Sequence, residues 1–226
     1  VERMTDRQLA WLRKDLSYVP EGSLVILNMH AAGWNEVSKE DNMRGAERLA
    51  EVLKDYRVHV FCGHTHFFQN VQVSENLYQH NIGAASGAWW AGRVNRCGAP
   101  NGYMIVSVDG DSLTWHYKPT GLPHTRQLHV YNVGEFATRR GYVVANVWDY
   151  DKRCRVEWFQ DGRPMGEMQR FTDVDESYAR CCGVRKRGSE TSHLFSCRPS
   201  GEYNEITVVF TNRFGERYTA SVTCGV

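Results

Sequence analysis

Apolar residues in the first half of the chain recur first at helical spacing and then as short continuous runs. Three leucines at intervals of three and four follow Thr5-Asp6-Arg7-Gln8, which matches a capping box and predicts that a helix begins there. A second apolar stripe predicts a helix over residues 41–56. The runs at 24–29 and 58–63 are bounded by turn residues and predict strands buried on both faces. This order of helix, strand, helix and strand predicts an α/β fold in which helices cover a mixed sheet.

The second half of the chain shows a different pattern, in which short strands are separated by turn residues. Tyr103–Val108 and Leu113–Tyr117 flank an Asp-Gly turn and predict a hairpin. The segment 118–123 contains two prolines and a glycine, and it predicts a linker between domains at 1–121 and 122–226. Further strands are expected at 127–132, 142–149, 155–160, 205–211 and 217–222. Their regular spacing predicts an all-β sandwich for the second domain.

Composition excludes several classes of protein. The 27 basic and 26 acidic residues give a net charge of +1, so no electrostatic footprint for nucleic acid is expected. No run of about 18 apolar residues occurs, and no membrane span is predicted. The seven cysteines include no Cys-x-x-Cys pair, which argues against a zinc knuckle.

The most informative chemistry lies in three histidines at predicted strand ends. Gly63-His64-Thr65-His66 ends the apolar run at 58–63, and His30 ends the run at 24–29. Ligands of open α/β sheets bind beyond the carboxyl ends of the strands, and neutral imidazole is a common ligand of zinc, iron and manganese. The pattern predicts that His30, His64 and His66 bind metal. A structural histidine pair within a turn is the alternative.

Several segments resemble one known family. The Gly-His-Thr-His tetrad, Leu27-Asn28-Met29-His30 and the loop Gly83–Trp90 are similar to the second half of the calcineurin-like metallophosphoesterases. Ala99-Pro100-Asn101-Gly102-Tyr103 and the segment 145–151 resemble a bacterial branch with a β-rich C-terminal domain.

The resemblance implies a catalytic domain built as a two-sheet sandwich flanked by helices, with two divalent ions (Zn, Fe or Mn). His30 and His64 would bind one metal and His66 the other. The implied reaction is hydrolysis of phosphate mono- or diesters by a metal-bound hydroxide.

The chain also departs from the family pattern. The motifs Asp-x-His and Gly-Asn-His are absent, and the only Gly-Asp pair, Gly110-Asp111, lies downstream in a hairpin turn. We therefore expect the chain to supply the histidine half of a dinuclear site and to be inactive alone, with the catalytic histidine and bridging aspartate upstream of it. The missing half or another segment would cover the sheet. An export signal upstream would make the protein periplasmic or secreted.

Aromatic residues suggest where a substrate binds. Trp89, Trp90, Asn101 and Tyr103 are candidates for the walls of a substrate pocket, in which aromatic rings suit a nucleoside or sugar. Packing of a tryptophan into the core is the alternative.

A rival hypothesis is a non-catalytic binding or interaction module with relic metal-site histidines. On that hypothesis the β-sandwich would bind a partner or glycan. Four aromatic residues would supply its contact surface: Trp148, Tyr150, Trp158 and Phe159. Alternating burial within a sandwich explains these aromatic residues equally well.

Overall fold

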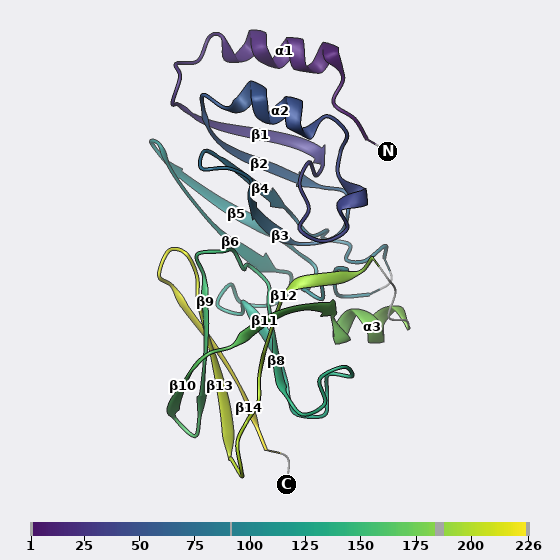
Figure 1. Cartoon of the computed structure of the whole chain (residues 1–226), viewed down its shortest axis with the longest axis vertical. Helices are drawn as coiled ribbons and strands as arrows, with labels where there is room; N and C mark the ends of the chain where they lie inside the picture. The colour runs from purple at the N-terminus through teal and green to yellow at the C-terminus, as the bar shows by residue number, and fades with distance from the viewer. Residues whose placement is uncertain (1, 91, 184–187, 225–226) are drawn as a thin grey trace.

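The computed structural model describes residues 2–90, 92–183 and 188–224, and these residues form a β-rich protein (Figure 1). Its helical elements are α1 (Asp6–Leu16), η1 (Lys39–Asp41), α2 (Ala46–Leu53) and α3 (Glu176–Cys182). The N-terminal strands are β1 (Leu24–Ala31), β2 (Arg57–Gly63), β3 (Gln69–Gln72), β4 (Leu77–Asn81), β5 (Gly102–Asp109) and β6 (Ser112–Pro119). The C-terminal strands are β7 (Leu128–Tyr131), β8 (Val143–Val147), β9 (Arg155–Gln160), β10 (Arg163–Glu167), β11 (Gln169–Val174), β12 (Glu190–Cys197), β13 (Glu205–Thr211) and β14 (Arg217–Thr223). No helix in the described ranges is long and apolar enough to cross a lipid bilayer.

The first sheet has the strand order β1-β2-β4-β3, in which β1, β2 and β4 are parallel and β3 is antiparallel to β4. Figure 1 shows α1 and α2 together on one side of this sheet. Leu9, Leu49 and Val60 are each fully buried in the apolar cluster between helices and sheet. The helix-and-strand order predicted from the hydrophobic pattern is therefore present at the N-terminus.

Both predicted helices occur, and the first begins where the capping box predicts. Thr5 and Gln8 form the capping box, since each side chain accepts a hydrogen bond from the backbone N–H of the other. The predicted helix at 41–56 is shorter, because a turn of 3-10 helix at η1 comes first. The helix α2 then begins after Gly45, whose φ of +86° is favourable only for glycine.

The expectation that residues 24–29 form a strand buried on both faces is wrong. β1 is an edge strand of its sheet, and Ile26 and His30 are exposed. β2 lies between β1 and β4 and is largely buried, as predicted for residues 58–63. The two runs look alike in sequence, and their position in the sheet decides which one is buried.

The remaining strands form a hairpin and two further sheets. β5 and β6 pair through the predicted turn. The strand orders of the two C-terminal sheets are β10-β9-β13-β14 and β11-β12-β8-β7. Side chains from both sheets share one apolar cluster, which includes Val147, Trp158 and Phe210.

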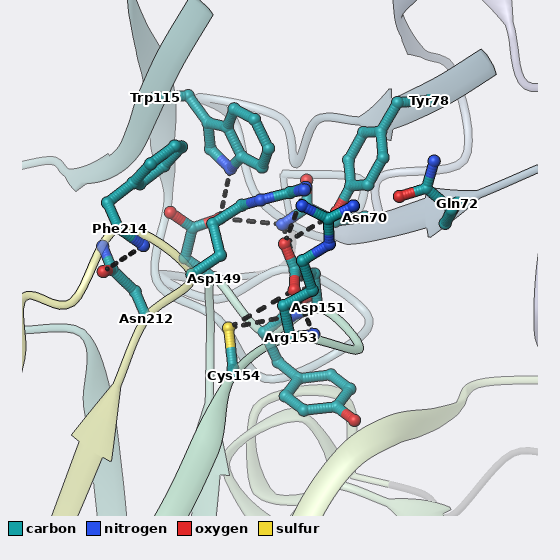
Figure 2. Close-up of polar contacts among 12 residues, drawn as sticks. Asn70, Gln72, Tyr78, Trp115, Asp149, Asp151, Arg153, Cys154, Asn212 and Phe214 are labelled. Atoms are coloured by element: carbon teal, nitrogen blue, oxygen red, sulfur yellow. Dashed lines mark hydrogen bonds and ion pairs between the residues drawn. The ribbon is translucent and has the colours of Figure 1, made fainter. Parts of the chain in front are cut away.

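Polar side chains connect the N-terminal sheet and hairpin to the loop after β8 (Figure 2). The Asp149 carboxylate accepts hydrogen bonds from Asn70 Nδ2 at 2.8 Å and from Trp115 Nε1 at 3.2 Å. The Asp151 carboxylate accepts a hydrogen bond from the Tyr78 hydroxyl at 3.0 Å and pairs with Arg213 at 3.1 Å. Loop residues from the C-terminal half thus hold strands and hairpin of the N-terminal half in place.

Candidate functional site

Two of the three predicted metal ligands converge at the carboxyl ends of parallel strands. His30 is the penultimate residue of β1, and His64 directly follows β2. His30 Nε2 lies 2.9 Å from His64 Nδ1, and the ring centroids are 4.7 Å apart. Adjacent parallel strands place their ends side by side, which is why residues 34 positions apart meet.

The turn between β2 and β3 is held in an unusual conformation. His64 and His66 have φ angles of +71° and +53°, in the left-handed region that non-glycine residues seldom adopt. Between them, Thr65 is buried, and its Oγ1 accepts a hydrogen bond from Asn81 Nδ2 at 2.8 Å. Asn81 is itself fully buried on β4. Because the Thr65 side chain is fixed in the interior, the neighbouring His64 stays at the surface, and the backbone of the turn is strained.

The third histidine is held in a defined tautomer. His66 Nδ1 lies 2.6 Å from the Gly87 carbonyl oxygen, which can only accept, so Nδ1 carries the proton. The Trp89 N–H, at 3.4 Å from the same nitrogen, therefore makes no hydrogen bond to it. Nε2 retains its lone pair. Histidines that bind metals commonly donate their other N–H to a backbone carbonyl in this way.

These residues do not complete a dinuclear metal centre. His64 Nε2 lies 3.3 Å from Glu2 Oε1, and a backbone hydrogen bond, followed by the charge of His64, lowers the pKa of Glu2. Within the described residues, no group of three His, Cys, Asp or Glu side chains is arranged to hold a metal ion.

A cavity of about 260 Å³ opens beside His64. Its walls include Glu2, Glu40, Asp41, His64, Trp89 and Arg96. The Arg96 guanidinium donates to the Thr65 carbonyl at 3.2 Å and to the Gly188 carbonyl, and it lies 3.6 Å from Asp41. Sequence reasoning missed Arg96, because a single arginine in a loop carries no recognisable pattern.

The four residues predicted to wall a substrate pocket occupy different places. Trp89 lines this cavity, and Trp90, next to it, is 86% exposed. The Asn101 side chain instead contacts the loop that follows Trp90, where its Nδ2 donates to the Gly92 carbonyl at 3.3 Å. Tyr103 is half-exposed on β5. Neither Asn101 nor Tyr103 lines the cavity at His64. The alternative of core packing does not apply to the two tryptophans, which are both exposed.

A family model described as the C terminal of calcineurin-like phosphoesterase matches residues 79–218. The chain belongs to this family. The match begins within β4 and ends within β14, so it includes Trp89, Trp90, Asn101 and Tyr103. His30, His64 and His66 precede the matched residues. Neither a curated protein nor a solved structure matches the chain.

A buried polar chain, which the sequence did not predict as a unit, connects strands β2, β3 and β4 to the loop after β8. His59 Nδ1 lies 2.9 Å from His80 Nε2, and His80 Nδ1 lies 2.8 Å from Asn70 Oδ1. Asn70 in turn donates to Asp149. Burial lowers the pKa of His59 to about 4 and that of His80 well below its usual value, so both rings are neutral near pH 7. His80 is fully buried, and both of its ring nitrogens have hydrogen-bond partners.

The aromatic residues of the rival hypothesis contribute little surface to this calcineurin-like region. Trp148 and Trp158 are buried. The Tyr150 ring packs against Phe195, with centroids 5.1 Å apart, and the Arg170 guanidinium lies over it. Trp148, Tyr150 and Trp158 therefore serve packing, which weakens the hypothesis that they recognise a partner.

Proposed function

We propose that the full-length protein hydrolyses phosphate mono- or diesters with the help of divalent metal ions, and that this chain supplies the histidine half of the site. The observation that carries the proposal is the convergence of His30 and His64 at the ends of two parallel strands, 2.9 Å apart. The tautomer of His66 supports it, because Nε2 is left as an available donor atom. Membership of the calcineurin-like family supports the phosphate-ester substrate.

The chain's own residues have separable tasks in this proposal. His30 and His64 bind one metal ion and His66 binds another, with zinc, iron or manganese as candidates. Divalent metal ions supply the Lewis acidity that hydrolysis of a phosphate ester needs. The bridging carboxylate and the catalytic histidine come from residues outside this chain, so the chain alone is inactive.

We also propose that the chain divides into two parts. Residues 1–121 form the C-terminal half of an α/β catalytic domain, and residues 122–226 form a β-sandwich. The separate sheets and the apolar cluster shared by two of them support this division.

Metal titration tests the role of the histidines. Calorimetric titration of the chain with Zn²⁺ or Mn²⁺ should show binding that His64→Ala weakens by at least tenfold. The exposed His124 lies outside the site, and His124→Ala is the matched control. If Zn²⁺ and Mn²⁺ bind equally to wild type and to His64→Ala, the assignment of His64 as a ligand is wrong.

A hydrolysis assay tests the claim that the site is partial. The chain with added Mn²⁺ should hydrolyse an aryl phosphate no faster than buffer with Mn²⁺. Steady turnover that depends on His64 and His66 would contradict the claim that further ligands are required.

A further inference from the structure

Trp89 presents a flat aromatic face next to the proposed metal site. Its indole stacks on the His66 imidazole, with ring centroids 4.1 Å apart and an angle of 21° between the planes. The side of the indole away from His66 is open, since Trp89 is 57% exposed and lines the cavity beside His64. A large exposed aromatic residue at a cavity is unusual for plain packing and is typical of ligand contact.

The position of Trp89 is enforced by its surroundings. Trp89 and Trp90 have φ angles of +55° and +63°, a conformation that is unfavourable for bulky residues. The loop is tied to the histidine turn by the hydrogen bond from His66 to Gly87 and by the Arg96 N–H, which donates to the His66 carbonyl at 2.9 Å. Such strain persists only where the neighbouring structure determines it, and it concentrates at binding sites.

Hydrogen bonds of the buried Asn95 side chain also stabilise the loop that carries Trp89. Its Oδ1 accepts a hydrogen bond from the Ala84 N–H at 2.7 Å, and its Nδ2 donates to the Pro100 carbonyl at 3.0 Å. Asn95 is fully buried, so the base of the loop is fixed. The backbone of the loop that carries Trp89 is therefore held in place before any ligand arrives, which reduces the entropy lost on binding.

The charge of the cavity restricts what can stack there. Glu2, Glu40 and Asp41 line it together with one arginine, Arg96. A group with several phosphates would be repelled by the three carboxylates. A neutral ring with hydroxyl groups would find hydrogen-bond acceptors in them. A volume of about 260 Å³ lies just below the range of roughly 300–1,000 Å³ that is typical of ligand pockets, and it suits one ring system.

We propose that Trp89 binds the planar ring of the substrate's organic group, and that the substrates are phosphate monoesters of nucleoside type. The inference rests on the proposed function, because the ring belongs to the ester that is hydrolysed. A ring stacked on the open face of Trp89 is separated from His66 by the thickness of the indole alone. That spacing is compatible with a phosphate held at the histidines and a base held at the tryptophan of the same small molecule.

Binding of adenosine to the 226-residue chain tests the proposal. Adenosine has no phosphate, and the measurement by ligand-observed NMR is made in EDTA, so it does not depend on metal binding. Trp89→Ala should weaken adenosine binding by about 5- to 150-fold, the range for loss of one base–aromatic stack. Trp89→Phe should retain most of the affinity. Trp11, which is 64% exposed on α1, provides the control Trp11→Ala, which should not change binding.

A comparison of Trp89→Leu with Trp89→Phe keeps the test valid if Trp89→Ala does not fold. Trp89→Leu and Trp89→Phe both fill the space with an apolar side chain, and only phenylalanine offers a π face. Circular dichroism and thermal unfolding establish that each is folded. Phenylalanine should bind adenosine at least fivefold more tightly than leucine.

Several results would overturn the proposal. Equal adenosine affinity in Trp89→Leu and Trp89→Phe would show that stacking is not used, and so would wild-type affinity in Trp89→Ala. Absence of adenosine binding, or binding of methyl β-glucoside in its place, would contradict the claim that Trp89 binds the ring of a nucleoside. Failure of the metal titration with intact adenosine binding would instead contradict only the proposed function.

Discussion

The buried carboxylate of Asp149 makes the stability of this protein depend on pH in a way that one substitution should reveal. Asp149 is 6% exposed and accepts hydrogen bonds from Asn70 Nδ2, Trp115 Nε1 and the Tyr117 N–H. Burial raises its pKa from 3.8 to about 7, and the hydrogen bonds oppose this shift only in part. The perturbation is Asp149→Asn, which has nearly the same shape and no charge.

The sign and size of the effect follow from the shift. An acid whose pKa is higher in the folded state destabilises that state as pH rises from the unfolded pKa, 3.8, through the folded pKa, about 7. At about 1.4 kcal/mol per pKa unit, the penalty grows by about 2–3 kcal/mol between pH 5 and pH 8. Asp149→Asn removes this growth. It also places an amide N–H₂ where Tyr117 donates, a pH-independent cost of about 1–3 kcal/mol.

Urea unfolding of both proteins at pH 5 and pH 8, followed by tryptophan fluorescence, measures the effect. The difference in unfolding free energy between wild type and Asp149→Asn should move by about 2–3 kcal/mol in favour of the variant at pH 8. Contributions from other titrating groups, including His59, cancel in this comparison. If the difference in unfolding free energy between wild type and Asp149→Asn is the same at pH 5 and at pH 8, burial does not dominate the ionisation of Asp149.

Three further substitutions test local features of the fold. Thr5→Ala removes the capping box of α1 and should lower the unfolding free energy by about 1 kcal/mol, measured by thermal unfolding. Gly87→Ala places a Cβ against Asn101 Oδ1 and forces alanine to a φ of +66°. It should cost at least about 1–2 kcal/mol in urea unfolding and alter the fluorescence of the neighbouring tryptophans. Phe210→Ala empties a fully buried position of the C-terminal core and should cost about 3–5 kcal/mol in the same assay. An unchanged urea midpoint in Phe210→Ala would contradict the assignment of that core.

Elements with strong local signals were predictable. The capping box begins α1, an Asp-Gly turn joins β5 to β6, and the strand predicted at residues 155–160 matches the bounds of β9. Each of these signals lies within a few neighbouring residues, and interactions among those residues produce the corresponding structure. The match to the family covers residues 79–218, and the family resemblance was carried by short motifs partly inside that range.

Strands without an apolar pattern were missed. The five residues of β4, Leu77–Asn81, are all buried, although three of them are polar. The buried Gln79 side chain accepts a hydrogen bond from the Gly33 N–H and donates one to the Trp34 carbonyl. The His80 ring is hydrogen-bonded to His59 and Asn70. These partners come from distant parts of the chain, so periodicity over a short window gives no sign of them.

The sequence by itself determined which chemistry is present. Three histidines follow predicted strand ends, and the carboxylate motifs of a dinuclear site are absent. Tertiary structure decided how these residues are used. The parallel pairing of β1 with β2 brings His30 to His64, the Gly87 carbonyl selects the tautomer of His66, and a strained loop holds Trp89 over that ring. Residue types are known from the sequence, whereas distances, tautomers and exposure depend on contacts between residues far apart along the chain.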